Sequence, residues 1–374
     1  MKTLLEYCTA HREEMVRTIE ALARLESPST DKAAVDRCGV EIAARLRALG
    51  AHVELLSGRD RGDHIAASWT GRGRPVLILG HFDTVWPVGT LTSMPVRRDG
   101  ERLHGPGVFD MKAGIALALT AVEALIENRV DRPAIRMLWT TDEEIGSGTS
   151  RAAIEAAARE SRAVFVLEPA LPGGALKTAR KGCGEYELVV DGVAAHAGLD
   201  PGKGISAIHE LADQIGAIEA LGDPSTGITV NVGIVDGGSR ANVVAARARA
   251  VIDARALTLA DANRLDAALR GLQPRRSGAR LTVTGGFERP PLERSSEVVR
   301  LLGIAREVSS ALGRTLDEGT AGGGSDGNFT AAVGVPTLDG LGAIGDGAHA
   351  AHEHVMIPDL PWRAALLAGL LTRA

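Results

Sequence analysis

The sequence predicts an α/β protein with a mostly parallel sheet, helices on both faces, and an inserted α+β domain. Apolar runs at 75–80, 135–139 and 163–167 are typical of strands buried on both faces. Helical patterns separate these runs, and the β-α-β-α-β order favours parallel strands. From residue 184 the order changes to β-α-β-β-α-β, which is that of a ferredoxin-like unit.

The first elements follow in order along the chain. Apolar residues at helical spacing predict a helix over 4–25. Asp31 is a candidate N-cap for a second helix that ends near Gly50. Short strands are expected at 53–56 and 65–69. Further helices are expected at 111–127, which is rich in Ala and Leu, and at 151–159.

The elements of the inserted part follow a different pattern. We expect strands at 184–190, 227–235, 246–255 and 280–285, and helices at 204–221 and 261–272. After Arg289-Pro290-Pro291 the patterns resemble those of the first half again. We therefore predict one discontinuous domain, 1–179 and 290–374, interrupted by a domain at 180–289.

Composition excludes several classes of protein. The 374 residues carry a net charge of -5, which gives no basic surface for nucleic acid. No apolar stretch is long enough for a membrane helix, and the charged N-terminus does not resemble a secretory signal. Three widely spaced cysteines indicate reduced thiols. We expect a cytoplasmic protein that binds neither nucleic acid nor membrane.

Five short polar patches carry the candidate chemistry. Each follows an apolar strand-like run or lies in a loop near one, and ligands of such sheets bind beyond the carboxyl ends of the strands. Together they could enclose two metal ions. The patches are His81-Phe82-Asp83, Gly107-Val108-Phe109-Asp110-Met111-Lys112, Asp142-Glu143-Glu144, Leu167-Glu168-Pro169 and Gly347-Ala348-His349.

Each patch taken alone also has an ordinary explanation. A His-x-Asp segment is common at surfaces, although alternation places His81 and Asp83 on one side of an extended chain. Asp110 precedes a helix, where an N-cap is the commoner role. The acidic triplet at 142–144 could be a solvated turn. A carboxylate at Glu168 would be partly buried and would need a partner.

The segment Gly322-Gly323-Gly324-Ser325-Asp326-Gly327 matches both a dinucleotide fingerprint and a nucleophile elbow. Both motifs require a preceding apolar strand, and residues 314–319 do not have the pattern of one. We therefore do not expect Ser325 to be a nucleophile. Backbone amides at Gly323 could still hold an anionic group of a substrate.

In this order the patches resemble the co-catalytic zinc peptidase and deacylase family, from about Ser27 to the C-terminus. Segment 27–32 and Glu168 resemble the glutamate carboxypeptidase branch most. The family histidine has an acidic residue four positions later, and Glu353 gives His349 this spacing, which His352 lacks. The resemblance implies two Zn²⁺ ions, with Co²⁺ or Mn²⁺ as substitutes. In the roles that it implies, His81 and Glu168 bind one zinc, His349 and Glu144 bind the other, and Asp110 bridges the two. Glu143 is the general acid/base, and Asp83 is the second-shell partner that orients His81.

The inserted domain resembles the family's lid, which makes a homodimer. His196 matches the lid histidine that stabilises an oxyanion in the neighbouring subunit, and Asn231 matches a lid asparagine of similar role. Arg289 matches the arginine that binds the substrate's α-carboxylate, and guanidinium pairs with carboxylate through two hydrogen bonds.

The implied reaction is hydrolysis of an amide bond next to a free carboxylate, with release of a C-terminal glutamate or a similar amino acid. An N-acyl-amino-acid deacylase of the acetylornithine deacetylase, desuccinylase or aminoacylase type is the alternative. A serine hydrolase and a binding protein without activity are two further classes. The second of these would lack a ligand or the base, and neither is missing.

Overall fold

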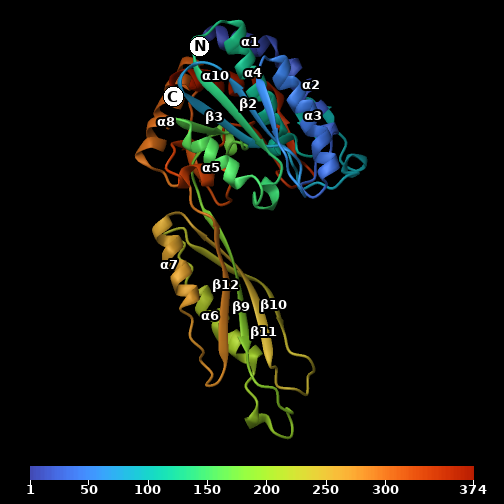
Figure 1. Cartoon of the computed structure of the whole chain (residues 1–374), viewed down its shortest axis with the longest axis vertical. Coiled ribbons are helices and arrows are strands. Elements are labelled where there is room, and N and C mark those ends of the chain that lie inside the picture. The colour runs from blue at the N-terminus through green and yellow to red at the C-terminus, as the bar shows by residue number, and fades with distance from the viewer. The chain divides into compact units, whose positions relative to one another are not determined.

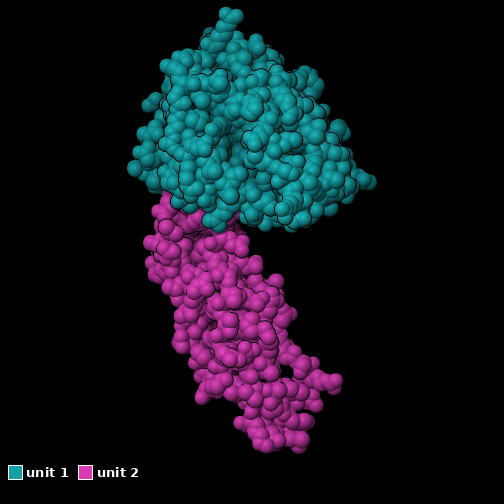
Figure 2. Space-filling view, viewed as in Figure 1, with its two compact units in different colours: residues 1–179, 294–321, 325–374 teal, residues 180–293, 322–324 magenta.

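A computed structural model describes residues 1–374. The chain divides into two compact units (Figure 2). Unit 1 comprises Met1–Ala179, Arg294–Ala321 and Ser325–Ala374, and unit 2 comprises Arg180–Glu293 with Gly322–Gly324. The second boundary lies four residues beyond the one expected at 289/290, and the short glycine segment was expected in the other domain.

Unit 1 is built on a six-stranded sheet (Figure 1). The pairings of β6 with β3, β3 with β7, and β7 with β14 are parallel, whereas β1 with β2 and β2 with β6 are antiparallel. The sheet is therefore mixed, which corrects the expectation of a mostly parallel one. Its strands in spatial order are β1 (His52–Leu56), β2 (His64–Trp69), β6 (Pro133–Thr140), β3 (Arg72–His81), β7 (Ala163–Val166) and β14 (Thr337–Leu338).

Helices cover both faces of this sheet, because its central strands are apolar on both sides. Val76 and Ile78 of β3 belong to the core with α1–α4, α8 and α10, whereas Leu77 and Leu79 pack with α5 and α9. The helices of unit 1 are α1 (Lys2–Ala10), α2 (Arg12–Arg24), α3 (Lys32–Ala48), α4 (Ala113–Glu127), α5 (Arg151–Arg159), α8 (Ser296–Ala311), α9 (Gly327–Ala332) and α10 (Leu360–Arg373).

Several details of unit 1 differ from the expected elements. The helix expected over 4–25 is two helices separated at His11, whereas Asp31 does cap α3 by accepting from Ala34 N. Two small sheets were not expected. Their strands are β4 (Arg97–Asp99), β5 (Arg102–His104), β15 (Gly345–Asp346) and β16 (His354–Met356) in one, and β8 (Leu176–Arg180) and β13 (Glu318–Ala321) in the other.

Unit 2 has the expected β-α-β-β-α-β order, and its antiparallel sheet runs β10-β11-β9-β12. Alternate residues such as Leu188, Ala250 and Ile252 pack with Leu211 and Leu265 of the two helices. The other sheet face is largely polar. None of the chain's helices is both long and apolar enough to cross a membrane. The elements of unit 2 are β9 (Gly182–Asp191), α6 (Ala207–Glu219), β10 (Thr229–Gly237), β11 (Arg247–Ala256), α7 (Leu259–Arg270) and β12 (Arg280–Arg289).

Candidate metal centre and active site

Three neighbouring parallel strands of unit 1 end at the same edge of the sheet, and each delivers polar side chains there. His81 is the last residue of β3. Asp142, Glu143 and Glu144 follow β6, and Glu168 follows β7. Because β3 lies between β6 and β7, these residues meet although up to 87 positions separate them in the chain.

Asp110 lies between two imidazoles. His81 Nε2 is 3.3 Å from Asp110 Oδ1 and 3.4 Å from Glu168 Oε1. His349 Nε2 is 3.5 Å from Asp110 Oδ2 and 3.0 Å from Glu144 Oε2. Each carboxylate oxygen of Asp110 thus faces one histidine, which is the arrangement expected of a bridging ligand. The structure brings together all five residues that the sequence nominated as metal ligands.

Asp83 supports two of these groups at once. Its Oδ1 lies 3.3 Å from His81 Nδ1, and its two oxygens accept from the backbone N–H groups of Glu143 and Glu144, both at 3.3 Å. Ser29 Oγ donates to Oδ2 at 2.7 Å. The carboxylate is fully buried, so it orients His81 and the acidic turn without facing solvent.

Glu353 holds the segment that carries Asp110. Its Oε1 accepts from Phe109 N at 2.9 Å and Asp110 N at 3.1 Å, and its Oε2 accepts from Gly107 N and Trp86 Nε1, both at 2.9 Å. The side chain is fully buried. Asp110 itself does not cap α4, since that helix begins at Ala113 and its N-cap residue is Lys112.

The carboxylates around the two histidines raise the pKa values of both imidazoles. Contacts with Asp110 and Glu144 raise the pKa of His349 to about 10. Burial opposes the charge on His81, but contacts with Asp110 and other carboxylates raise its pKa well above the ordinary value. Burial also raises the pKa of Glu144. Several carboxylates therefore lie close together in this site, and bound cations would stabilise their negative charge.

The residues fit a pair of divalent cations. Asp110 Oδ1 and Glu144 Oε1 are buried and receive no hydrogen bond. Ligand atoms of His81, Asp110 and Glu144 lie within 4.8 Å of one another, and so do those of His81, Glu143 and Glu168. Imidazole nitrogens and carboxylate oxygens are the donors that zinc accepts in catalytic sites.

The alternative residues lie elsewhere in unit 1. His352 Nε2 faces Asp346 Oδ2 at 3.7 Å, and its side chain is largely exposed. A short strand, β13, precedes the glycine-rich segment, but its residues are small or polar and mostly not buried, so it is not the apolar strand that either motif requires. Ser325 is fully buried, and its Oγ donates to Asp339 Oδ2 at 2.7 Å. A buried hydroxyl bound to a carboxylate is not placed as an exposed nucleophile.

In unit 2, the ring of His196 is held in one tautomer. Its Nδ1 accepts from Gly198 N at 3.2 Å and Leu199 N at 3.1 Å. A neutral ring with an accepting Nδ1 carries its proton on Nε2. The exposed side chain of His196 therefore presents an N–H donor to solvent.

Asn231 does not lie beside this histidine. It sits in β10 opposite Asp253, six residues before the strand ends at Gly237, or about 20 Å along it. The asparagine next to the histidine segment is Asn242, whose backbone carbonyl accepts from Ala197 N at 3.0 Å. His196 and Val243 form an isolated antiparallel β-bridge beside it. Strand pairing over a long sequence separation places Asn242 there.

Arg289 ends β12 and pairs with Cys183 of β9. Its side chain is mostly buried and lies against Gly324, where an added Cβ would come within 3.0 Å of Arg289 Cδ. Arg180 Nη1 donates to the carbonyls of Gly323 and Gly324, both at 3.1 Å, and Arg255 Nη1 donates to Gly322 O at 3.0 Å. These bonds attach the glycine segment to unit 2.

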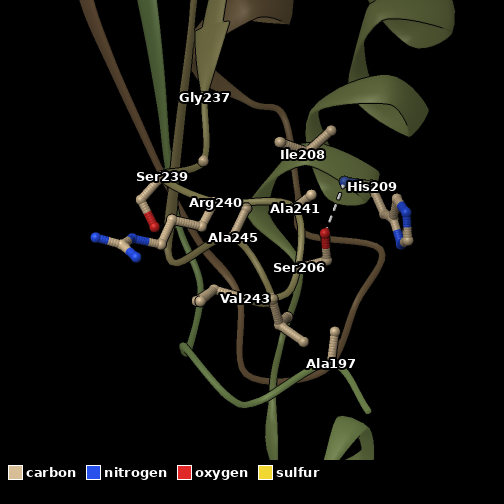
Figure 3. A pocket seen from close by; sticks show the side chains of 12 residues that line it. Ala197, Ser206, Ile208, His209, Gly237, Ser239, Arg240, Ala241, Val243 and Ala245 are labelled. Carbon is tan, nitrogen blue, oxygen red and sulfur yellow. Dashed lines mark hydrogen bonds between the residues drawn. The ribbon is translucent and has the colours of Figure 1, made fainter.

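A hollow of about 550 Å³ lies in unit 2 beside the His196 segment. Figure 3 shows Arg240 and His209 on opposite sides of it, with Ser206 Oγ accepting from His209 N at 3.2 Å. Ala197, the residue after His196, also lines it. The hollow belongs to unit 2, whereas the carboxylate cluster belongs to unit 1, so its size alone does not mark the reactive centre.

Some supporting residues had little or no signal in the sequence. Glu353 was noticed only by its spacing from His349, and Ser29 only as part of a segment shared with relatives. Nothing nearby in the sequence indicates that Trp86 serves this site. Its role depends on a contact with Glu353, from which 267 positions separate it.

Comparison with known proteins identifies the family. Residues 77–373 match the model of peptidase family M20/M25/M40. Carboxypeptidase G2 from Pseudomonas sp. (strain RS-16) is 30% identical over 98% of this chain and 91% of its own. Succinyl-diaminopimelate desuccinylase from Stenotrophomonas maltophilia (strain K279a) is 30% identical over 95% of this chain and 97% of its own.

The solved structure of the YXEP protein from Bacillus subtilis superimposes on this chain with a TM-score of 0.71 at 16% identity. The match covers 97% of this chain and 98% of the YXEP chain, and that protein is described as a dinuclear metal binding peptidase from the M20 family. These findings confirm the resemblance inferred from the five patches. The chain therefore belongs to peptidase family M20/M25/M40 and is a metal-dependent hydrolase of the peptidase and amidohydrolase type.

Proposed function

We propose that this enzyme uses two Zn²⁺ ions to hydrolyse an amide bond next to a free carboxylate, and that it releases a C-terminal glutamate or a similar amino acid. The observation that carries the proposal is the position of Asp110 between His81 and His349, with Glu168 and Glu144 beside them. In this role the ions would lower the pKa of a water molecule and polarise the scissile carbonyl.

Glu143 is the residue we assign as general acid/base. It lies in the same cluster as His81 and Glu168, and its backbone N–H is held by Asp83. It would accept the proton of the attacking water and pass it to the leaving amine. Glu143 is not one of the five proposed ligands, so in this proposal its role is proton transfer and not metal binding.

Unit 2 supplies the residues for substrate recognition in this proposal. Arg289 would pair with the α-carboxylate of the substrate, and backbone amides at Gly323 would bind the same group. The Nε2–H of His196, supplied by the partner subunit of a dimer, would donate to the developing oxyanion. Asn231 is proposed to assist in this role, and Asn242, whose backbone carbonyl accepts from Ala197 N, is a second candidate for it.

A homodimer through unit 2 is part of the proposal. Strand β10 is an edge of its sheet and has one unpaired side. Ile234 and Val235 on this strand are 54% and 53% exposed, and Ile208 on α6 is 44% exposed. An unpaired strand with exposed apolar residues is suited to pairing with a second copy. Sedimentation at several protein concentrations would test the association.

A deacylase is the second candidate, because the desuccinylase shares the same 30% sequence identity with this chain as the carboxypeptidase does. The two are separated by one panel: peptidyl and folate-type glutamate amides, N-acetyl amino acids and N-succinyl amino acids, each assayed with metal-loaded enzyme. We expect the highest kcat/KM for the glutamate amides. A clear preference for N-acetyl or N-succinyl substrates would support the deacylase instead.

Metal dependence is tested in the same panel. Chelation should abolish hydrolysis, and added Zn²⁺ or Co²⁺ should restore it, while serine-directed inhibitors have no effect. Activity that survives complete metal removal would contradict the proposed mechanism for either substrate class.

A further inference from the structure

A chain of hydrogen bonds runs beneath the acidic turn of unit 1. It starts at His64, a buried residue of β2. His64 Nε2 lies 3.1 Å from Thr149 Oγ1, and Thr149 Oγ1 donates to Asp142 Oδ2 at 2.7 Å. Thr149 N donates to the same oxygen at 2.6 Å. His64, Thr149 and Asp142 have no part in the chemistry described so far.

Both ring nitrogens of His64 face threonine hydroxyls. Nε2 lies against Thr149 Oγ1, whose one hydrogen goes to the carboxylate of Asp142. Nδ1 lies 3.0 Å from Thr141 Oγ1, which donates to Gly62 O at 2.7 Å. His64 is thus held at both ends, and its contact with Thr149 connects it to Asp142.

Asp142 closes the turn that carries the reactive carboxylates. Its backbone carbonyl accepts from Ser147 N at 2.8 Å, and its side chain accepts from Thr149 N, so residues 142–149 form a loop tied to Asp142 at its far end. Glu143 and Glu144 lie inside this loop. Their own amides reach Asp83 only at 3.3 Å, which is longer than a typical hydrogen bond.

We propose that His64 and Thr149 are positioning residues that act through Asp142 to hold Glu143 and Glu144 in place. This inference rests on the proposed function of those two glutamates. A carboxylate that must meet a water molecule and a metal ion tolerates little displacement, since an error near 1 Å can cost about 100-fold in rate. Loss of the chain should therefore lower kcat and leave substrate binding, and hence KM, nearly unchanged.

The main variant is Thr149→Val, which removes the hydroxyl and keeps the side-chain shape. Thr149 is exposed, so the core is not disturbed. We expect kcat to fall at least about tenfold, with KM and bound zinc unchanged. Thr149→Ser retains the hydroxyl and should stay within about twofold of the parent enzyme. Ser225→Ala is the matched control: it removes a hydroxyl that donates to Asp223 Oδ1 in unit 2, and it should leave kcat unchanged.

A double-mutant cycle tests whether the two residues act as one chain. His64→Phe and Thr149→Val should each lower kcat, and the double variant should be no slower than the slower single one. If the two single losses of kcat multiplied in the double variant, the proposal that His64 and Thr149 act together would be overturned. A parent-like kcat in metal-loaded Thr149→Val would overturn it as well.

Amide hydrogen exchange separates this inference from the proposed function. Thr149→Val should speed exchange at Ser147 and Thr149 at least about tenfold, even if no substrate is hydrolysed by the parent enzyme. An inactive parent enzyme would refute the proposed function, whereas unchanged exchange at these amides would refute the positioning role.

Discussion

Replacing Glu353 tests how the Asp110 segment is held. The carboxylate accepts four hydrogen bonds, three of them from the backbone of Gly107, Phe109 and Asp110. At about 1–3 kcal/mol for each buried donor left unpaired, Glu353→Ala would cost between about 4 and 12 kcal/mol. A typical domain has about 5–15 kcal/mol in total, so this variant is expected to fold poorly.

Glu353→Gln is therefore the informative change. The amide offers one acceptor oxygen and turns its NH₂ towards two of the four donors, so about 2–6 kcal/mol of stability should be lost. Because Asp110 N is among the donors, we also expect metal affinity to fall by about 10–100-fold. Urea unfolding of the metal-free protein gives the first quantity, and calorimetric metal titration gives the second.

The control for Glu353→Gln is Glu54→Gln, which removes a negative charge from an exposed position of β1. It should change neither quantity by a measurable amount. Parent-like stability together with parent-like metal affinity in Glu353→Gln would falsify the view that this carboxylate anchors the segment.

Three further predictions concern other parts of the molecule. Glu143→Ala should retain both metal ions and lose turnover, which metal analysis and kcat will show; normal turnover would refute its role as acid/base. Arg363→Met should lower the unfolding free energy by about 2–5 kcal/mol in urea, because the buried guanidinium donates to Gly342 O and Gly174 O, and a parent-like midpoint would contradict this. Contact with Arg294 lowers the pKa of Glu318 from 4.5 to about 2, so its stabilising effect is present above pH 4.5 and is lost as the pH falls towards 2. The stability difference between the parent and Glu318→Gln should shrink over that range, and a constant difference would refute the assignment.

The central strands could be predicted from the sequence because their burial leaves a continuous apolar signal. Residues 75–80 and 135–139 lie within β3 and β6, and both strands are buried between two helical layers. The direction of the outer strands could not be predicted, since the half-exposed pattern of β1 is the same for parallel and antiparallel pairing.

The nominated ligands could be found because acidic residues directly after apolar strands are unusual, and the order of the patches resembles a known family. Apart from Asp83, the residues that support these ligands could not be found in the same way. Asp142 stood in the acidic triplet, but its contact with Thr149 requires the turn to be folded, and His64 reaches that turn from 85 positions away. The sequence around a polar strand residue does not indicate which distant residue it will hydrogen-bond.

The glycine segment shows a related limit. Gly322–Gly324 has no side chains that could specify where it packs, and it was assigned with its sequence neighbours. Its carbonyls accept from Arg180 and Arg255, so donors far away in the chain decide its place. Arg180 ends β8, two residues before β9 begins, and Arg255 lies on β11, so the pairing of β9 with β11 brings these donors together.

Backbone amides, rather than cationic side chains, hold the segments around the carboxylate cluster. Glu353, Asp83 and Asp142 each accept from backbone N–H groups of a segment that carries a proposed ligand. Lys112, the buried lysine two residues after Asp110, donates instead to the carbonyls of Leu22 and Leu25. An N–H donor satisfies a carboxylate without adding a formal positive charge, so the negative charge of the ligand set is kept for a cation. Because the same bonds fix the backbone in advance, little conformational entropy is left to lose when metal binds.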